Sequence, residues 1–513
     1  MKFKTSPYLT NQQVETGLKQ VIKDGLTAEV MVTMTGGTFL MAMAVLMKAT
    51  NFQIGLMTAL PTLTNIFQLF STWLVQKYNN RRAVMVISSF IARLPLFMIG
   101  ALPFLFSKGT NIQVLIFMLS FHYIFGSIAG ASWSSWMKDL VPEQRMGSYF
   151  AHRSRLMMTL NVVLSVALAL SLDYIKAHYP QYELSAYAIM FIIGGIFGML
   201  GVHALARTPE PTSYLAKENL FKLFSKPVKD KNFRNLLAFQ SFWTFALNLA
   251  TPFFSVYMMK TMGLSLSYII GFGLLTQIGT ILSIKMWGKY ADTFSNKTII
   301  SIAAPIYIAS ILAFTFTAIP TSKLVAVIIL AVINIVGGAC IAGINLAIDN
   351  FGLKLAPKEE AIVYISARNV IVAFISALAP MIGGFMADLL ANHSVAWNIH
   401  WNGTGGVSTI QLLNLHNWNF MFIAGGILAI LSLQMLKYIN EEGAVHKGQA
   451  VGAMKIAFKN NFKEHTSKEA ILGILYLPVT YPIALKRKVQ GRIEQRAAVI
   501  RRLNNINALR KRA

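Results

Sequence analysis

Few side chains of this chain could carry chemistry, and several of them lie within long apolar stretches. Glu29, Arg93 and His122 are ionisable, and their neighbours are mostly apolar. Ionisable residues are expensive at membrane depth, so each is a candidate for function. An imidazole changes its charge near neutral pH, which suits proton transfer. We expect Glu29 and His122 to bind protons, Arg93 to be structural, and Asp24 to reach the nearby interface; a hydrogen-bonded, purely structural His122 stays open.

The sequence contains no recognisable catalytic centre. It has no glycine-rich phosphate loop with its Lys and no Gly-x-Ser-x-Gly motif. His393, His400 and His416 share one segment, but their spacing matches no standard metal site. Cys340 is the single cysteine, which excludes an internal disulfide. We expect neither enzymatic activity nor a metal ion or other cofactor.

The elements that must position these residues are membrane-spanning helices. Of the 513 residues, 55% are hydrophobic and only 13% are charged, which is little charge for a soluble chain of this length. The apolar residues form runs close to the ~20 residues that cross a bilayer. We expect an all-α polytopic membrane protein with twelve spans, at 25–47, 52–76, 83–106, 112–137, 147–172, 184–206, 235–259, 265–288, 298–319, 323–349, 361–390 and 418–439.

The distribution of basic residues predicts the orientation. Alternate connecting segments carry most of the Lys and Arg, for example Lys138 and Lys289, whereas the longest segment on the other side, 391–417, carries none. By the positive-inside rule, both termini lie in the cytoplasm and the protein spans the cytoplasmic (inner) membrane. The formal net charge of +26 then reflects topology and contact with anionic lipids of the inner leaflet. It gives no reason to expect a nucleic-acid partner.

The chain repeats itself at a constant offset, which indicates a tandem duplication. Pro142, Tyr149 and Arg153 recur 215 residues later as Pro357, Tyr364 and Arg368, and the same offset carries Arg81-Arg82 onto Asn296-Lys297. The predicted divisions are a cytoplasmic N-terminal segment (1–24), a six-span bundle (25–206), a basic cytoplasmic connector (207–234), a second six-span bundle (235–440) and a basic tail (441–513) held at the membrane interface.

Three motifs resemble a known transporter family. The segment 287–297, Trp-Gly-Lys-Tyr-Ala-Asp-Thr-Phe-Ser-Asn-Lys, resembles the Gly-x-x-x-Asp-x-x-Gly-basic-basic loop of the major facilitator superfamily, and its first-half copy keeps only the basic pair Arg81-Arg82. The segment 122–126 resembles the family's Arg-x-x-Gln-Gly element, with His in place of Arg. The segment 133–143 is similar to a pattern in a poorly characterised bacterial branch of the family.

This resemblance implies two pseudo-symmetric six-helix bundles around a central cavity lined by spans one, four, seven and ten. Amide and aromatic side chains on these spans suit a neutral, zwitterionic or partly apolar solute, although each could equally hold helices together. No cluster of Arg and Lys at membrane depth is visible in the sequence. The candidates for the cavity are Thr33, Phe121, Gln240, Trp243, Asn248, Asn334 and Asn345.

The resemblance also implies a cytoplasmic latch, in which a loop carboxylate meets the start of a helix in the other half. Lys77 stands where the first loop would have its acid, and Glu359 or Glu360 could bind it. In the second loop the acid is Asp292, opposite Arg145 or Arg153. Ordinary solvated charges are the alternative. The remaining latch candidates are Arg81, Arg82, Asp139, Gly288, Lys297 and Arg368.

The function that this resemblance implies is secondary active transport of a small organic solute by alternating access, as a monomeric, proton-coupled symporter. Two alternatives stay open. One is a transport-inactive membrane assembly factor or sensor, for which the altered first loop and the long tail 441–513 are the evidence. The other is efflux of drugs or lipid-like solutes, although span five lacks the Gly-x-x-x-Gly-Pro-x-x-Gly-Gly stretch of the family's drug/proton antiporters.

A charge exchange tests the predicted latch. Lys77→Glu and Glu360→Lys should each impair transport, because each places like charges opposite one another. The double variant restores opposite charges and should recover transport in a flux assay. Failure of the double variant to recover flux would count against this pair.

Overall fold

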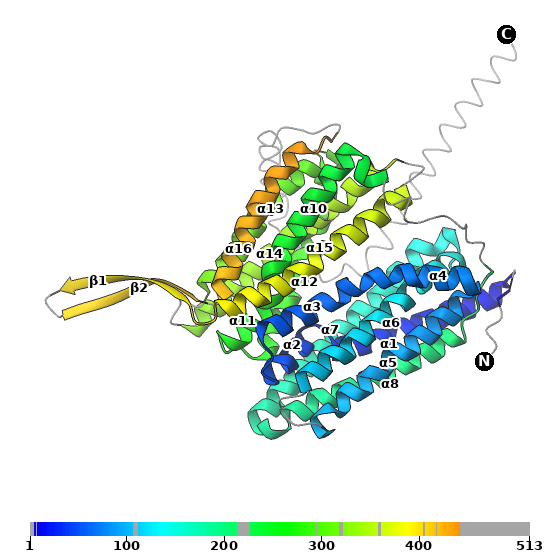
Figure 1. The fold of residues 1–513 in the computed structure, drawn as a ribbon, viewed down its shortest axis with the longest axis horizontal. Coiled ribbons are helices and arrows are strands. Elements are labelled where there is room, and N and C mark those ends of the chain that lie inside the picture. The colour runs from blue at the N-terminus through cyan, green and yellow to red at the C-terminus, as the bar shows by residue number, and fades with distance from the viewer. Residues whose placement is uncertain are drawn as a thin grey trace, which may run out of the picture. The chain divides into compact units, whose positions relative to one another are not determined.

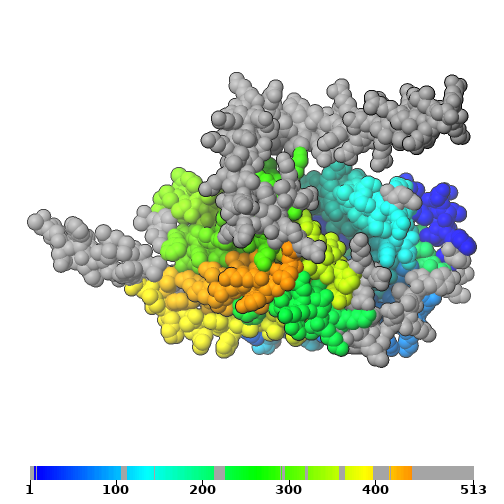
Figure 2. Space-filling view, turned by 90° about the horizontal axis from the view of Figure 1, so that it is seen from above, coloured from blue at the N-terminus to red at the C-terminus, as the bar shows by residue number. Residues whose placement is uncertain are grey.

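The computed structural model of the protein describes residues 5–6, 8–105, 111–212, 226–293, 295–317, 322–357, 361–403, 406–416 and 418–441. Within these ranges the chain is helical apart from one β-hairpin and an isolated bridge between Ser6 and Pro211. Figure 2 shows the first half of the chain, in blue and cyan, beside the second half, in green to orange.

The first half contains helices that run alternately in opposite directions (Figure 1). The first span bends where α1 passes to α2 at Gly37, whose φ of +54° favours glycine. The second span is interrupted after Pro61 by one turn of 3-10 helix. The bounds are α1 Asn11–Thr35, α2 Gly37–Leu46, α3 Asn51–Leu63, η1 Thr64–Phe67, α4 Gln68–Tyr78, α5 Arg81–Leu105, α6 Asn111–Leu140, η2 Glu143–Arg145, α7 Met146–His178, η3 Pro180–Tyr182 and α8 Glu183–Ala206.

The second half repeats this order. Its first span is broken at Pro252 into α10 and α11, as the second span of the first half is broken near Pro61. The bounds are α10 Lys231–Ala250, η4 Thr251–Phe253, α11 Phe254–Lys260, α12 Leu266–Thr293, α13 Asn296–Ala313, η5 Phe314–Phe316, α14 Lys323–Leu355, α15 Ala361–Leu389, β1 Ser394–Gly403, β2 Gly406–His416, α16 Trp418–Met435 and η6 Leu436–Tyr438.

Eleven helical segments of the described chain are long and apolar enough to cross a membrane. The interrupted pair α10 and α11 covers the remaining predicted span, 235–259. The fold class predicted from the sequence is therefore confirmed: an all-α polytopic membrane protein. The first span begins earlier than predicted, since α1 starts at Asn11 rather than near residue 25.

The segment 391–417, interpreted from the sequence as a long loop, contains a β-hairpin instead. Strands β1 and β2 pair antiparallel, with an irregularity between Trp397 and Asn398. The alternation of Val395, Trp397 and Ile399 with smaller or polar residues favours strands. Figure 1 shows this hairpin at the end of the molecule where α15 finishes, which we call the hairpin end. The opposite end, where α1 begins, is called the basic end.

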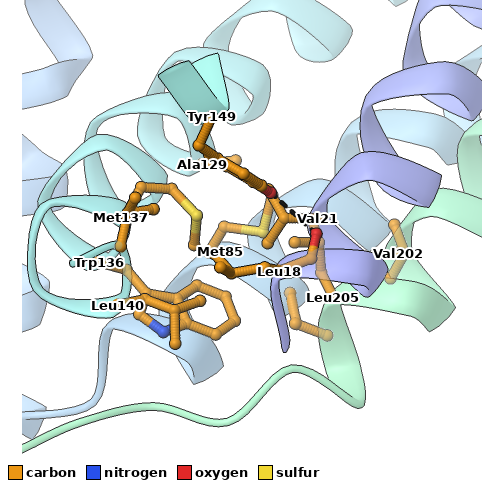
Figure 3. Packing of buried hydrophobic residues seen from close by; sticks show 12 residues of the cluster. Leu18, Val21, Met85, Ala129, Trp136, Met137, Leu140, Tyr149, Val202 and Leu205 are labelled. Carbon is orange, nitrogen blue, oxygen red and sulfur yellow. Dashed lines mark hydrogen bonds between the residues drawn. The ribbon is translucent and has the colours of Figure 1, made fainter. Parts of the chain in front are cut away.

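A buried cluster closes the first bundle near the basic end (Figure 3). Trp136 of α6 is fully buried, and its Nε1–H donates to the Pro209 carbonyl at 3.1 Å. The hydroxyl of Tyr149 in α7 donates to the Leu18 carbonyl of α1 at 2.8 Å. Tyr364, its partner in the duplication, is also buried, against Phe233 at the start of the second half. The repeated tyrosine therefore anchors the first helix of each half.

A second repeated feature is a buried carboxylate at the start of the third span of each half. Glu210 accepts hydrogen bonds from the backbone N–H groups of Arg81 (2.7 Å) and Arg82 (3.1 Å), where α5 begins. Glu441 accepts from Asn296 (3.1 Å) and Lys297 (2.9 Å), where α13 begins. Each carboxylate satisfies N–H groups that a helix start leaves unpaired.

These two carboxylates should differ in their effect on stability. The Glu210 side chain also lies 3.4 Å from Arg81, which is 1% exposed, so Glu210→Gln leaves a buried charge with one partner fewer. Breaking a buried pair costs about 3–5 kcal/mol. Glu441→Gln loses a pair with Lys354, whose side chain is 55% exposed, and surface pairs contribute about 0–1 kcal/mol. Thermal unfolding of the purified variants should show the larger decrease for Glu210→Gln, and equal decreases would contradict this ranking.

Candidate functional site

A cavity of about 280 Å³ lies inside the first bundle and gathers four ionisable side chains. They come from four helices: Asp24 from α1, Arg93 from α5, His122 from α6 and Arg153 from α7. On α6 the helical period places Gly126, one turn after His122, on the same wall. The sequence did not place Asp24 or Arg153 in this cavity.

Asp24 is buried, with 4% of its surface exposed, rather than extended to the interface as expected. Arg93 and Arg153 are the two cations whose charges act on its carboxylate. Among the described residues, no side chain or backbone group donates a hydrogen bond to that carboxylate within 3.5 Å. The carboxylate is therefore placed between two guanidinium groups without being locked to either.

The two arginines are incompletely paired. Arg93 is 7% exposed; its Nη1 donates to the Ser89 carbonyl at 3.0 Å, and its Nε has no hydrogen-bond partner. Arg153 makes only a 3.5 Å contact from Nε to the Val21 carbonyl, and its guanidinium lies 5.0 Å from the ring centre of Trp133. The buried Nε1 of Trp133 also lacks a partner. Several donors therefore line one small space.

His122 lies in this cavity, where its ring is held by the backbone. Its Nδ1 lies 2.6 Å from the Ala92 carbonyl oxygen, which can only accept, so Nδ1 carries the hydrogen. In the neutral ring Nε2 is then the acceptor. The predicted position beside a cavity and the alternative of a hydrogen-bonded residue between helices thus describe the same side chain.

Glu29, the other predicted proton site, lines a different region. Its carboxylate accepts from Nδ2 of Asn161 in α7 at 3.0 Å, and the same amide lies 2.9 Å from the Thr33 hydroxyl. Thr33 and Asn161 line a second cavity of about 260 Å³, which α12 of the other bundle also lines through Gln277. This cavity therefore lies between the bundles.

The other predicted cavity residues have varied positions. Trp243 is 2% exposed and stacks on Phe239, so it packs inside the second bundle. Asn334 accepts a hydrogen bond from Thr276 of α12 at 3.0 Å, which makes it a contact between helices. Phe121 and Asn345 are exposed, whereas Gln240 and Asn248 are half-buried.

Two carboxylates connect the bundles at the hairpin end. Asp388 of α15 accepts from the backbone N–H groups of Asn51 (2.9 Å) and Phe52 (2.8 Å), where α3 begins. Asp173 of α7 accepts from Leu266 (3.0 Å) and Ser267 (2.9 Å), where α12 begins. All three positions are related by the offset of 215 residues, so the duplication repeats one contact in both directions across the bundle interface. The sequence carried this signal in its register, but our sequence analysis did not detect it.

The two seams between the bundles differ in how closely they pack. A Cβ at Gly55 of α3 would lie 2.0 Å from the Pro380 carbonyl oxygen, and one at Gly384 of α15 would lie 2.2 Å from that of Asn51. Only glycine fits at such a close approach. In the other seam the corresponding residues are Ile270 and Ala169. The α7–α12 seam therefore has side chains where α3 and α15 touch, and it contains the second cavity.

The residues assigned to a cytoplasmic latch mostly contact their own bundle. Arg81 bonds Asp139 at 2.5 Å, and Arg145 pairs with Glu15. This pairing differs from the expected contact of Arg145 with Asp292, because α1 begins earlier than predicted and brings Glu15 to the basic end. The Lys77 ammonium lies 5.0 Å from the Trp73 ring centre.

Other members of the predicted latch also lie within the second half. Arg368 binds Asp349 at 3.1 Å, and the Lys297 ammonium donates to the Ile439 carbonyl at 3.1 Å. Gly288 lies in α12, with open space where a Cβ would be. Glu359, Glu360 and the side chain of Asp292 lie outside the described residues.

Two repeated bundles joined through reciprocal helix contacts define a class of polytopic membrane proteins with internal symmetry. The sequence profile described as Major Facilitator Superfamily matches residues 26–380. The chain belongs to the Major Facilitator Superfamily, as the motifs predicted. No curated protein matches it in sequence.

Solved structures share this fold at low sequence identity. The nucleoside transporter NupG is 15% identical, with a TM-score of 0.58, covering 84% of this chain and 100% of its own. A D-xylose-proton symporter is 14% identical, with a TM-score of 0.57 and coverages of 84% and 99%. A bacterial homologue of the iron transporter ferroportin, in an inward-facing state, is 11% identical, with a TM-score of 0.55 and coverages of 84% and 100%. At these identities the likeness concerns the fold.

Replacing both Asp173 and Asp388 with Asn should loosen the hairpin end. Charge at a helix N-terminus contributes about 0.3–2 kcal/mol per contact, and an amide contributes less. A cysteine at Thr33, in a Cys340→Ala background, would report access from the hairpin side to a membrane-impermeant maleimide in sealed vesicles. We expect labelling to become several-fold faster in the double variant.

Asp349→Asn is the matched control, because it removes one aspartate charge at the other end of the second bundle, where Asp349 pairs with Arg368. It should leave the labelling of Thr33→Cys unchanged. Equal labelling rates in the double variant and its parent would contradict a role for the two aspartates in closing the hairpin end.

Proposed function

We propose that this chain is a proton-coupled secondary transporter that moves a small organic solute across the cytoplasmic membrane by alternating access. Membership of the superfamily supports secondary transport in general. The observation that carries the mechanism is the pair of reciprocal carboxylate contacts at the hairpin end, made by Asp173 and Asp388. In this proposal both termini are cytoplasmic, the basic segments contact anionic lipids, and the transporter works as a monomer.

The reciprocal contacts suit a rocking motion of the bundles. Each contact consists of one carboxylate and two backbone N–H groups, so the two can form and break together when one bundle rotates against the other. In the described ranges, the hydrogen bonds observed between the bundles lie at the hairpin end. Contacts of this kind are strong enough to favour one state and weak enough to be reversed.

At the basic end we propose the opposing set of contacts that closes in the other state. Lys77 remains the first-half member, to be joined by Glu359 or Glu360 at the start of α15. Asp292 remains the second-half member, with Arg153 as the partner that has no carboxylate of its own at the basic end. Closure there would use charges that open solvent screens in the present state.

Proton coupling is assigned to the cavity of the first bundle. Asp24 is a buried carboxyl group, and its charge interacts with Arg93 and Arg153 on two other helices. Binding a proton would remove one charge from this set, and a buried charge is sensitive to any rearrangement of its partners. His122 lies beside it, and Glu29, about one turn further along α1, is the second candidate.

Asp24→Asn should uncouple transport from protons. The amide imitates the neutral carboxyl group, so we expect solute exchange across proteoliposome membranes to persist while accumulation driven by a pH gradient is lost. The solute is first found by a thermal-shift screen of a solute library with the purified full chain. Glu29→Gln is the matched variant, and it should keep the accumulation if Asp24 is the coupling site.

The same measurement separates the transporter from the assembly factor or sensor. Solute exchange by wild-type proteoliposomes supports transport, whereas no flux of any solute that shifts the melting temperature would contradict it. Accumulation that survives in Asp24→Asn but disappears in Glu29→Gln would transfer the coupling role to Glu29.

A further inference from the structure

We propose that the cavity of the first bundle binds the anionic group of the transported solute, a carboxylate or a phosphate monoester, between Arg93, Arg153 and Trp133. This deepens the proposed function and rests on it, because it names the chemical class of the solute. It also revises the expectation of a neutral, zwitterionic or partly apolar solute, since that expectation relied on there being no cluster of basic residues at membrane depth.

The balance of charges and donors in the cavity favours an anion. Two guanidinium groups face one carboxylate, that of Asp24, so the set has an excess of positive charge. Nε of Arg93 and Nε1 of Trp133 are buried donors without partners. Unpaired buried donors are rare and costly, so each calls for an acceptor. A carboxylate or phosphate supplies several acceptor oxygens and matches the planar fork of a guanidinium.

The cavity has room for such a group because α6 contributes two glycines to its wall. A Cβ at Gly126 or Gly130 would meet no atom within 4 Å. By contrast, a Cβ at Gly198 of α8 would lie 2.6 Å from the sulfur of Met31. Gly126 and Gly130 therefore leave space open, whereas Gly198 permits close packing of helices.

Asp24 and a solute anion would compete for the same arginines. The charged groups that act on Asp24 are Arg93 from α5 and Arg153 from α7, and Tyr149 of α7 also lies within electrostatic range of it. On α6 the ionisable neighbour is His122, and α8 presents Gly201 beside the Asp24 carboxylate. A proton on Asp24 would release both guanidinium groups. Binding of the anion and of the proton would therefore support each other.

Titration calorimetry on the purified full chain tests this inference with matched probes. Benzoate is compared with benzamide, lactate with lactamide, and glycerol-3-phosphate with glycerol, so that each pair differs mainly in the anionic group. We expect at least one anion to bind about tenfold or more tightly than its neutral partner, as charge-assisted hydrogen bonds imply.

Variants locate the binding. Arg93→Gln and Arg153→Gln should each weaken that anion at least about tenfold, whereas Arg155→Gln, an exposed arginine two residues further along α7, should not. Gly130→Ala should weaken binding by filling the cavity, whereas Gly147→Ala, at an equally open but exposed helical site, should not. Asp24→Asn should bind the anion more tightly than wild type, a gain that a merely structural role for Asp24 does not predict. Melting temperatures identify any variant that is misfolded.

The inference is wrong if no anion binds more tightly than its neutral partner, or if binding is unchanged in Arg153→Gln and Gly130→Ala proteins that melt as wild type. Weaker anion binding in Asp24→Asn would contradict the competition. These results are distinct from failure of the proposed function, because a neutral solute that exchanges across proteoliposomes would overturn the inference and leave transport intact. An anion that binds as expected but shows no flux would support the site and contradict transport.

Discussion

The architecture depends on one interaction, a carboxylate that accepts two backbone N–H groups at the start of a helix. In a membrane such groups must find partners within the protein. Glu210 and Glu441 make this contact inside each bundle, where their side chains are 2% exposed. Asp173 and Asp388 make it between the bundles. The same chemistry therefore holds each bundle rigid at one end and connects the two reversibly at the other.

Duplication explains why these contacts come in pairs, and divergence explains why the seams are unequal. Gly55 and Gly384 bring the backbones of α3 and α15 together, whereas Ile270 and Ala169 hold α7 and α12 further apart. A pseudo-symmetric scaffold can in this way keep a tight seam on one side and a cavity on the other. The asymmetry arises from side-chain size alone.

The ionisable groups of the first bundle have no counterpart of the same composition in the second. The offset of 215 residues carries Arg153 onto Arg368, yet Arg368 is paired with Asp349 while Arg153 lies in a cavity beside Trp133. The offset carries Asp24 onto Phe239 and Arg93 onto Ile308, both of which are buried and apolar. Charge was thus retained in only one of the two related bundles, which is where a function using a single central site would place it.

The sequence by itself determined the class of protein, the two-bundle organisation and the family, because hydrophobic run length and a repeated register are properties of the linear chain. It also identified His122 as a cavity residue. Only the tertiary structure decided that Asp24, Arg93 and Arg153 meet, since this depends on how four helices rotate about their axes as they pack. For the same reason Trp243 and Asn334, polar or aromatic on spans expected to line the path, pack against neighbours instead. Helix rotation is set by packing with partners distant in sequence, and the pattern of one helix does not contain it.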